Sequence, residues 1–441
     1  MICFSPEELA QWAGALWSGR VPPLIQGVSH DTRTLKNGDL YVAIPGERFD
    51  GHDFVEQAFE KGAVGALVND DFSLDGYPLL KVPDTLKGLQ DLARGYRDTW
   101  TGTVVGITGS VGKTTVKEMC AEVLSQKGLV HRTAGNFNNH IGLPLSMLSM
   151  PRTAAYGVFE IGMSHPGEIA ELAENLRPNI AIISDICNAH RESFESLEAI
   201  AREKAALLAS LPSSGLAILD RDSEWFELMS DQTCAQTVSI SFGVAGDYVG
   251  YKVGDSVLEV NGFEYTMPLP GDHIMRNALR AIALGLELGE EPSAIAAGLC
   301  RFKNPPMRWQ EHKINGVHFV NDAYNANPLS MRAGLQTFAE LKGAGKKWAV
   351  LGGMRELGES EAAEHAALGR FVDELNFDGV VAVGALAAQI QCSRTERIYY
   401  CAEAAEAAQI LKNNLRTDDC VLLKASRGER LERVLECFKE I

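Results

Sequence analysis

The fold of this chain is decided by Val104-Val-Gly-Ile-Thr-Gly-Ser-Val-Gly-Lys-Thr-Thr115. Residues 104–108 predict a short buried strand, the glycines that follow predict a turn, and a helix is expected from Lys113 to Gln126. A strand, a glycine-rich turn and a helix together form a phosphate-binding loop, because backbone N–H groups of the turn point at phosphate oxygens. The stretch therefore predicts a nucleotide-binding domain.

Individual residues of this loop have separate expected roles. Lys113 supplies a positive charge and Thr114 supplies a hydroxyl suited to Mg²⁺. Gly109 and Gly112 permit backbone angles and a close approach to phosphates that a side chain would forbid. The common pattern G-x-x-x-x-G-K-[ST] is incomplete, because Ile107 occupies its first glycine position. The alternative is a tight strand–helix turn with a solvated lysine, but the intact Gly-Lys-Thr-Thr favours nucleotide binding without naming the reaction.

Composition and charge limit the classes of protein to which the chain can belong. Its 441 residues exceed what one hydrophobic core usually serves, and 46% hydrophobic residues are ordinary for globular domains. A net charge of −17 argues against nucleic-acid binding, because no basic field attracts phosphates. The nine cysteines contain no C-x-x-C pair, so they predict neither a zinc site nor a disulfide framework. No apolar run reaches the roughly 18 residues of a membrane span, so we expect a soluble, cytoplasmic protein.

The expected strands and helices divide the chain into three α/β domains. Residues 1–99 combine short strand-like runs with helical stretches and predict a smaller N-terminal α/β domain. Residues 100–307 alternate strands and helices, which predicts a central, doubly wound, mostly parallel sheet of the P-loop type. Between Thr237 and Pro270 the pattern predicts β-hairpins, with a turn at Asn261-Gly262. Residues 308–441 return to β/α alternation and predict a smaller, Rossmann-like C-terminal domain.

Polar residues follow the ends of expected strands in the central domain. Glu160 ends one strand and is suited to hold a Mg²⁺ that the nucleotide brings, and His190 lies just past another strand end. Alone, either residue is more often structural, but two of them around one loop reinforce each other. Lys204 lies on the next helix, where a lysine is usually solvated. Three amide donors, which fit an Asx-rich turn equally well, are Asn136, Asn138 and Asn139.

Motifs along nearly the whole chain, from Ser29 to Arg430, resemble the Mur ligase family. The phosphate loop of that family also lacks the first glycine. The other motifs that carry the resemblance are Gly135-Asn-Phe-Asn-Asn-His-Ile-Gly-Leu-Pro144, Glu160-Ile-Gly-Met-Ser-His-Pro-Gly-Glu168, Asn188-Ala-His190, Gly271-Asp-His273 with Asn277, and Asp322-Ala-Tyr-Asn-Ala-Asn-Pro328. The resemblance implies a three-domain ligase that uses ATP to phosphorylate a carboxylate, so that an amine can displace the phosphate.

The resemblance also implies a role for each motif residue. For the ATP site, it implies Thr108, Gly109, Ser110, Val111, Gly112, Lys113, Thr114, Asn277, Arg308 and Asp322. For two Mg²⁺ ions, it implies Thr114, Glu160, His190 and Lys204, with Lys204 carried as a carbamate. For catalysis, it implies Lys113, Glu160, His190 and Lys204. For the other substrates, it implies Ser29, Thr32, Arg33, Asn136, Asn138, Asn139, Tyr324, Asn325 and Asn327.

Three C-terminal motifs are similar to the branch of the family that joins D-alanyl-D-alanine to UDP-MurNAc-tripeptide. They are Asp322-Ala-Tyr-Asn-Ala-Asn-Pro-Leu-Ser-Met331, Leu351-Gly-Gly-Met-Arg-Glu-Leu-Gly358 and Lys424-Ala-Ser-Arg-Gly-Glu-Arg-Leu-Glu432. The resemblance implies that residues 1–99 hold the UDP-sugar, that the C-terminal domain binds the dipeptide, and that the domains close around the substrates. Gly353 and Asp220 depart from the family pattern, in which Asp and Asn are usual. The alternatives are another amino-acid ligase of the family or a folylpolyglutamate ligase, and a monomer is expected.

Overall fold

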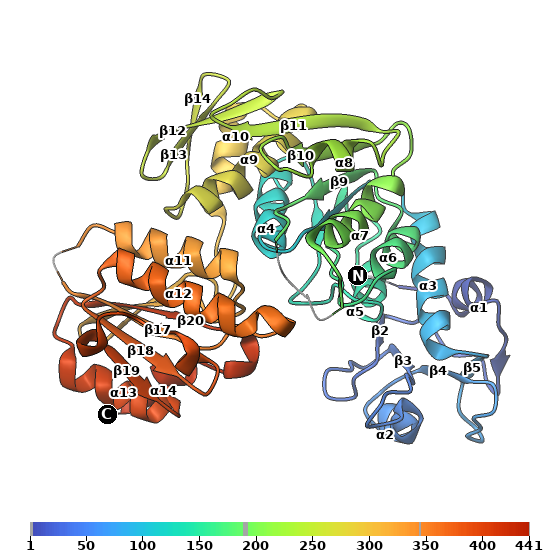
Figure 1. Ribbon diagram of the computed structural model, residues 1–441. Coiled ribbons are helices and arrows are strands. Elements are labelled where there is room, and N and C mark those ends of the chain that lie inside the picture. Colours follow the sequence, from blue (N-terminus) through green and yellow to red (C-terminus); the bar gives the residue numbers. More distant parts are fainter. Residues whose placement is uncertain (1–2, 188–192, 344, 441) are drawn as a thin grey trace.

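The computed structural model describes residues 3–187, 193–343 and 345–440, and these residues form three β-sheets. Figure 1 shows the sheets in three bodies: residues 17–82 at the lower right, residues 103–266 above them, and residues 310–424 at the left. Helices accompany each sheet. The predicted α/β class, with a mostly parallel central sheet, is confirmed.

The first sheet has the strand order β1-β5-β4-β3-β2, in which β1 runs antiparallel to β5 and the others run parallel. Its elements are α1 (Pro6–Ala13), β1 (Trp17–Ser18), β2 (Gly27–Ser29), β3 (Asp39–Val42), η1 (Gly51–Phe54), α2 (Val55–Glu60), β4 (Gly65–Asn69), β5 (Leu79–Val82) and α3 (Thr85–Thr99). Helix α1 begins with a reciprocal cap between Ser5 and Glu8 and ends at Gly14, whose φ is 61°.

The central sheet has the strand order β14-β13-β12-β11-β10-β9-β6-β8-β7. Its strands are β6 (Thr103–Thr108), β7 (Val130–Arg132), β8 (Tyr156–Glu160), β9 (Ile180–Ile183), β10 (Leu216–Asp220), β11 (Gln236–Phe242), β12 (Tyr248–Gly254), β13 (Val257–Val260) and β14 (Phe263–Thr266). Its helices are α4 (Lys113–Leu124), α5 (Gly142–Leu148), α6 (Glu168–Leu176), α7 (Leu197–Ala209), α8 (Phe226–Ser230), α9 (Asp272–Glu287) and α10 (Pro292–Arg301).

Two hydrophobic cores lie on the two faces of the central sheet. Residues of α4, α9 and α10 pack together in one core, and residues of α5, α6 and α7 pack in the other. The second core continues into the first domain through α3, which packs against both α5 and α6. A continuous core fixes the first domain against the central one, because apolar side chains on both sides lose their contact with water together.

The predicted hairpins occupy the edge of the central sheet, with one exception. Strands β12, β13 and β14 pair antiparallel, and Asn261 and Gly262 have φ values of 55° and 77° at the β13–β14 turn, as a type I′ turn requires. Strand β11 instead pairs parallel with β12, so the hairpin prediction is wrong at this junction. The cause is Asp247, which accepts hydrogen bonds from the backbone N–H and hydroxyl of Ser239 at 2.8 and 2.6 Å and holds the connection beside β11.

The third sheet has the strand order β15-β16-β20-β17-β18-β19, and all but β15 run parallel. Its elements are β15 (Gln310–Ile314), β16 (Val317–Asn321), α11 (Pro328–Glu340), β17 (Lys347–Leu351), η2 (Gly358–Ser360), α12 (Glu361–Leu375), β18 (Gly379–Val383), η3 (Ala387–Gln389), η4 (Thr395–Arg397), β19 (Ile398–Cys401), α13 (Ala404–Asn414), β20 (Cys420–Lys424), η5 (Arg427–Glu429) and α14 (Arg433–Glu440). Helices α11 and α12 contribute to one core and α13 and α14 to the other.

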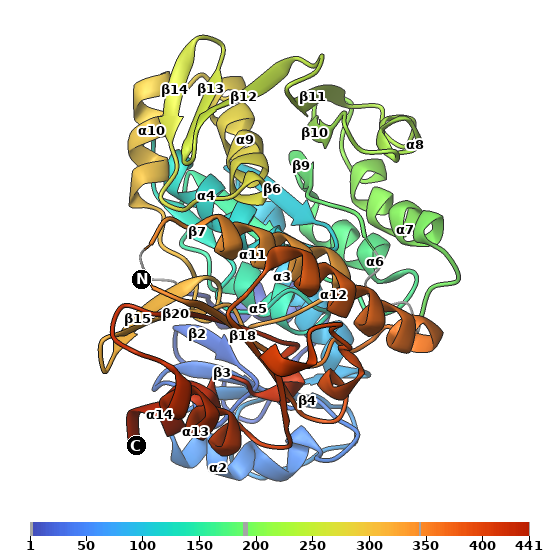
Figure 2. The same ribbon diagram turned by 60° about the vertical axis from the view of Figure 1, so that its left-hand side comes forward.

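Helix α11 lies next to the central domain (Figure 2). A Cβ on Gly271, just before α9, would lie 2.7 Å from the hydroxyl of Thr337 on α11. Lys342, after α11, pairs with Asp255 of the β12–β13 turn at 2.5 Å. The central and C-terminal domains therefore approach each other at both of these points.

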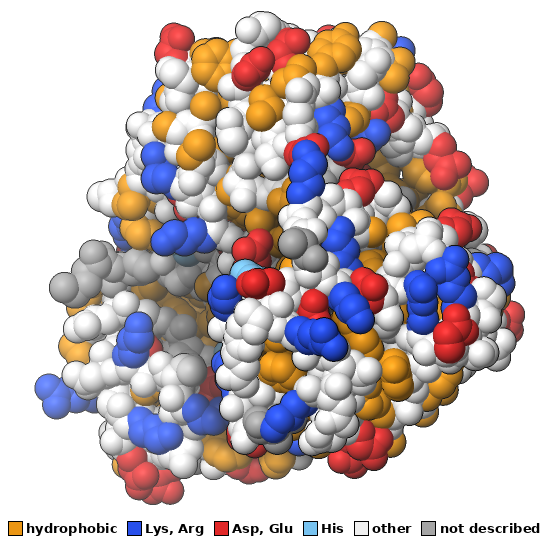
Figure 3. Space-filling view, turned by 90° about the vertical axis from the view of Figure 1, so that its left-hand side faces the viewer, with side chains coloured by type: hydrophobic (Ala, Val, Ile, Leu, Met, Phe, Trp, Pro, Cys, Tyr) orange, Lys and Arg blue, Asp and Glu red, His pale blue; other side chains and the backbone are white. Residues whose placement is uncertain are grey.

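Charged side chains of both signs are interspersed over the face of the molecule that Figure 3 presents. Within the ranges that the structure describes, no helix has both the length and the apolar character needed to cross a membrane.

Candidate active site

A cleft with a volume of about 1070 Å³ lies between the central and C-terminal domains. One wall consists of the loops after β6, β7, β8, β9 and β10 together with the start of α9, and the other wall consists of the loops after β16, β17 and β20. Both sets of loops follow the carboxyl ends of parallel strands, where α/β sheets bind ligands. The fold thus brings the phosphate loop and the C-terminal motifs to one place.

The phosphate loop rests on the segment that follows β9. Ser110 donates its backbone N–H to the carbonyl of Asp185 at 2.7 Å, and Ser184 donates its hydroxyl to the carbonyl of Val111 at 2.5 Å. Thr108, directly before the loop, is fully buried and does not line the cleft. The loop backbone is therefore held from behind, which leaves its front free for phosphate oxygens.

Both glycines of the loop adopt conformations that a side chain would disturb. Gly109 has a φ of 153°, and a Cβ there would lie 1.8 Å from the hydroxyl oxygen of Ser184. Gly112 has a φ of 82° at the N-terminus of α4, and a Cβ there would lie 2.7 Å from Oδ1 of Asn277. The need for glycine predicted at both positions is confirmed.

Thr114, Glu160 and Asn138 meet at the floor of the cleft. Thr114 donates its hydroxyl to Oε2 of Glu160 at 2.8 Å, and Asn138 donates Nδ2 to Oε1 at 2.8 Å. Glu160 is only 4% exposed, and its backbone N–H donates to the hydroxyl of Thr133 at 3.1 Å. Both carboxylate oxygens therefore have fixed positions beside the phosphate loop.

Two lysines near the loop have lowered pKa values. Lys113 donates its ammonium to the carbonyl of Gly109 at 2.8 Å, and burial lowers its pKa while the charge of Glu160 opposes that shift. Lys204 on α7 is 1% exposed, and burial lowers its pKa well below the usual value, with the like charge of Lys113 adding to the effect. A lowered pKa increases the fraction of neutral amine at neutral pH, which is the form of lysine that reacts with carbon dioxide.

The donor atoms at the floor of the cleft fit a Mg²⁺ ion that arrives with a nucleotide. In the described part of the chain, no three His, Cys, Asp or Glu residues are grouped to hold a metal on their own. Thr114 and Glu160 nevertheless place hard oxygens side by side, and Mg²⁺ at nucleotide sites is held by one or two carboxylates plus phosphates. The predicted ligand His190 belongs to residues 188–192, which lie outside the described residues.

The C-terminal wall of the cleft is organised around Asp322. Lys424, which is 3% exposed, donates its ammonium to Oδ2 of Asp322, and Trp309 donates its backbone N–H to Oδ1 at 3.1 Å. The guanidinium of Arg308 lies 4.2 Å from the centroid of the Tyr324 ring. Arg308, Asp322 and Tyr324 all line the cleft, as does Asn277 on the opposite wall.

Several of the asparagines predicted to bind substrate also hold the backbone. Asn139 accepts the N–H of Gly142 at 2.8 Å at the start of α5, and Asn327 accepts the N–H of Ser330 at 2.8 Å at the start of α11. Asn325 accepts the N–H of Ala326 at 2.9 Å. All three line the cleft together with Asn136 and Asn138. The same residues therefore fix the backbone and line the cleft.

The predicted residues of the first domain do not line this cleft. Thr32 donates its hydroxyl to Gln57 at 2.8 Å, and Ser29 donates its hydroxyl to the carbonyl of Asp31 at 3.2 Å. The guanidinium of Arg33 pairs with Asp31 and lowers the pKa of that carboxyl to about 2. Strand β2, which ends at Ser29, packs against α5, the helix that follows the asparagine loop at residues 136–139.

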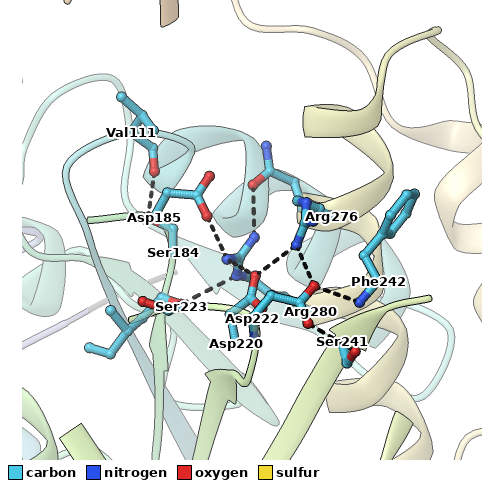
Figure 4. A network of polar contacts seen from close by, with 12 residues as sticks. Val111, Ser184, Asp185, Asp220, Asp222, Ser223, Ser241, Phe242, Arg276 and Arg280 are labelled. Atoms are coloured by element: carbon cyan, nitrogen blue, oxygen red, sulfur yellow. Dashed lines mark hydrogen bonds and ion pairs between the residues drawn. The ribbon is translucent and has the colours of Figure 1, made fainter. Parts of the chain in front are cut away.

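Sequence reasoning missed an arginine–aspartate network in the wall of the cleft (Figure 4). Arg280 is fully buried and donates to Asp185 at 2.8 Å and to Asp220 at 3.1 Å. Arg276 donates to Asp222 at 2.9 Å and to Asp220 at 3.4 Å. Burial raises the pKa of Asp220 and the two arginines oppose that shift, so an Asp at position 220 has a structural partner in this chain. The available signal was the pair of arginines four residues apart on α9, facing acidic strand ends.

The departure at Gly353 also has a structural basis. A Cβ at this position would lie 2.4 Å from the Cβ of Leu386, so the present backbone leaves no space for an aspartate. The carbonyl of Gly353 accepts the N–H of Ser426 at 3.0 Å, which ties the loop after β17 to the loop after β20.

A phosphate loop with a buried carboxylate at its foot, facing a second α/β domain across a cleft, defines a nucleotide-using enzyme. Sequence comparison specifies the class: the Mur ligase middle domain matches residues 107–285, the Mur ligase glutamate ligase domain matches residues 307–427, and the Mur ligase family catalytic domain matches residues 24–97. The chain belongs to the Mur ligase family and is an ATP-dependent ligase with three domains.

Relatives that match over most of the chain bear a more specific name. A protein of Bacillus subtilis (strain 168) is 38% identical over 94% of this chain and 93% of its own length, and one of Escherichia coli (strain K12) is 35% identical over 94% of both. Both are named UDP-N-acetylmuramoyl-tripeptide–D-alanyl-D-alanine ligase. The crystal structure of MurF from Acinetobacter baumannii superimposes with a TM-score of 0.91 at 29% identity, covering 100% of this chain and 99% of that one. The structure of MurF ligase from Thermotoga maritima in complex with ADP gives a TM-score of 0.83 at 30% identity, with coverages of 94% and 97%.

Proposed function

We propose that this protein joins D-alanyl-D-alanine to the terminal carboxylate of UDP-MurNAc-tripeptide, with conversion of ATP to ADP and phosphate. The observation that carries the proposal is the cleft, in which the phosphate loop faces the three C-terminal loops that resemble this branch of the family. The names of relatives that match over more than nine-tenths of the chain support the same substrates.

The chemistry that we propose has two steps. An oxygen of the tripeptide carboxylate attacks the γ-phosphorus of ATP, the bond to the β-phosphate oxygen breaks, and an acyl phosphate and ADP form. The amine of the dipeptide then attacks the acyl carbon, loses a proton, and expels inorganic phosphate as the peptide bond forms. Phosphorylation is required because a carboxylate is a poor electrophile, so the protein mainly positions groups and neutralises charge.

Residues of the central domain have defined tasks in this scheme. The amides of the phosphate loop and Lys113 bind the phosphates, while Thr114 and Glu160 hold a Mg²⁺ ion with the nucleotide. Bound Mg²⁺ supplies positive charge to the phosphate oxygens. Asn138 keeps the carboxylate of Glu160 in place through its 2.8 Å hydrogen bond. In the C-terminal domain, Asp322 and Arg308 contact the nucleotide from across the cleft.

Lys204 is proposed to carry a carbamate that acts as a second anionic metal ligand. Support comes from its burial and from its lowered pKa, which favour the neutral amine, the form that attacks the carbon of carbon dioxide. Mass spectrometry under non-acidic conditions should find an added carbon dioxide on the peptide that contains Lys204. Lys204→Ala should lose activity that bicarbonate cannot restore but short carboxylic acids partly restore. Full activity in the variant would remove Lys204 from the site.

The remaining assignments extend beyond the cleft. We propose that Ser29, Thr32 and Arg33 bind the UDP-sugar on the first domain, because β2 lies against α5 beside the asparagine loop. The boundaries at residues 99/100 and 307/308, a monomeric state and a cytoplasmic location belong to the same proposal. The location follows from the substrates, since nucleotide-linked precursors and ATP are cytoplasmic metabolites.

A phosphate-release assay with a panel of substrates tests the function. Purified protein should release phosphate with ATP, Mg²⁺, UDP-MurNAc-tripeptide and D-alanyl-D-alanine, and the product mass should equal that of the two substrates joined with loss of water. Panels with single amino acids as acceptors, or with UDP-MurNAc-dipeptide or a folate as the carboxylate substrate, should give little release. Preferential release with one of these alternatives would reassign the protein within the family.

A further inference from the structure

Arg280 contacts several residues beside the phosphate-loop end of the cleft, although its own side chain is buried. Its side chain on α9 has no exposed surface. Its Nε donates to the carbonyl of Ile183 at 3.2 Å, and its Nη2 donates to Asp185 at 2.8 Å and to Asp220 at 3.1 Å. The remaining nitrogen, Nη1, lies 3.5 Å from Oδ1 of Asn277, one helical turn earlier. A buried guanidinium requires such partners, because an unpaired buried charge is strongly destabilising.

Two of these contacts reach the phosphate loop. Ile183 and Asp185 flank Ser184, whose hydroxyl donates to the loop at Val111. The carbonyl of Asp185 accepts the N–H of Ser110 at 2.7 Å. By holding both residues that flank Ser184, Arg280 fixes the segment on which the phosphate loop rests.

The contact with Asn277 fixes the direction of an amide. A guanidinium has donors and no acceptor, so the atom of Asn277 that faces Arg280 must be the oxygen. The amide nitrogen, with its two donors, is then directed away from Arg280. Asn277 is 4% exposed and lines the cleft, and Ile274, one turn earlier on the same helix, lines it as well. Amide donors beside an apolar side chain suit a ligand with a flat ring and hydrogen-bond acceptors, as a purine base has.

We propose that Arg280 is a positioning residue for the nucleoside part of ATP, acting through Asn277. It turns the amide of Asn277 so that the cleft offers donors to the base, and it holds the same helix against the phosphate loop. The inference deepens the ATP use of the proposed function and is independent of which carboxylate and amine are joined.

The first test is a double-mutant cycle on ATP binding. The dissociation constant of Mg-ATP is measured by calorimetry for the wild type, Arg280→Lys, Asn277→Ala and the double variant. Arg280→Lys keeps the charge but loses the guanidinium fork, and we expect about tenfold weaker binding, the scale of one lost hydrogen bond. In the Asn277→Ala background the same change should weaken binding clearly less than tenfold, because only the contribution through Ile183 and Asp185 to the phosphate loop remains. Losses that multiply in full would show independent roles and overturn the proposal.

A second test applies even if Arg280→Lys fails to fold. Asn277→Asp retains an oxygen for Arg280 but offers no donor, so the melting temperature should be unchanged or higher. Binding of Mg-ATP should weaken about tenfold more than binding of inorganic tripolyphosphate, which lacks a base but meets the same added negative charge beside Gly112. Equal losses for both ligands, or unchanged ATP binding, would contradict the proposal. Arg202→Lys is the control for the arginine exchange, because Arg202 pairs with Glu198 on the surface of α7.

Both measurements use ATP or tripolyphosphate without the peptide substrates. A failure of D-alanyl-D-alanine ligation would therefore leave this inference untouched, and a failure of the cycle would leave the proposed ligation untouched.

Discussion

Asn138 offers a sensitive test of the magnesium site, because its contact with Glu160 can be changed in two opposite ways. The side chain donates to Oε1 of Glu160 at 2.8 Å, and Glu160 is 4% exposed. Asn138→Ala leaves that carboxylate oxygen without its donor. Asn138→Asp places a second carboxylate beside the first. Asn138→Ala should destabilise the protein whether or not Mg²⁺ is present. Asn138→Asp should also destabilise it, but binding of Mg²⁺ should reverse part of that loss.

The sizes of both effects follow from the geometry. A hydrogen bond to a charged group contributes about 1.5–3 kcal/mol, so Asn138→Ala should lower the free energy of unfolding by about that amount. Two like charges about 4 Å apart repel by about 4 kcal/mol at an effective dielectric constant of 20, and uptake of a proton relieves part of this in Asn138→Asp. Mg²⁺ should therefore stabilise Asn138→Asp more than it stabilises the wild type, since the variant offers it two carboxylates.

Thermal unfolding with and without Mg²⁺ measures both effects. Asn136→Ala is the matched control for stability, since no hydrogen bond of the Asn136 side chain occurs within the described ranges of the chain, and its melting temperature should equal that of the wild type. If Asn138→Ala were as stable as the wild type, Asn138 would not hold the carboxylate of Glu160 in place. If Mg²⁺ raised the melting temperatures of Asn138→Asp and the wild type equally, the assignment of Glu160 to a magnesium site would be wrong.

Three further changes probe other contacts. Gly109→Ala should weaken ATP binding, measured by calorimetry, about a hundredfold or more, because its Cβ would lie 1.8 Å from the hydroxyl oxygen of Ser184. Gly135→Ala is the control in the same assay, because Gly135 also has a positive φ but its Cβ would meet nothing within 4 Å. Burial lowers the pKa of His131 from 6.5 to about 4. The unfolded chain therefore binds a proton at a higher pH than the folded protein does, and the free energy of unfolding should fall by up to about 3 kcal/mol as the pH drops through this range. His131→Phe should lose this part of the acid sensitivity in urea titrations, and an unchanged pH profile would refute the assignment. Asp220→Asn, which introduces the residue usual in the family, should lower the melting temperature by a few degrees, because Arg280 would keep only one carboxylate partner. Equal stability would show that Asp185 alone is enough to stabilise the buried Arg280.

The order of strands and helices around the phosphate loop was predictable because each element has a local cause. Helix α4 begins at Lys113 as predicted, and Lys204 lies on a helix, α7, as expected. The turn at Asn261-Gly262 was predictable because few dipeptides accept two positive φ angles. The parallel pairing of β11 with β12 depends on Asp247 folding back on Ser239, a contact that no alternation of apolar residues records.

The candidate site was predictable where a residue sits at a strand end and not where its role depends on packing. Glu160 and Thr114 were expected near each other, since loops at the strand ends of one sheet meet at one edge, and a 2.8 Å hydrogen bond joins them. Arg280 was missed because a helical arginine is usually solvated, and its complete burial appears only when α9 packs behind Asp185 and Asp220. The continuous core through α3 was equally invisible in the sequence, because it depends on contacts between two domains.

The central claim, that this ligase activates a carboxylate by phosphorylation, can be tested by following one oxygen atom. UDP-MurNAc-tripeptide with heavy oxygen in its terminal carboxylate is incubated with the protein, ATP, Mg²⁺ and D-alanyl-D-alanine, and the released phosphate is analysed by mass spectrometry. An acyl phosphate passes one carboxylate oxygen to phosphate, so each phosphate released should carry one heavy oxygen. Release of unlabelled phosphate alongside the joined product would contradict the account, because the carboxylate would then have been activated without becoming phosphorylated.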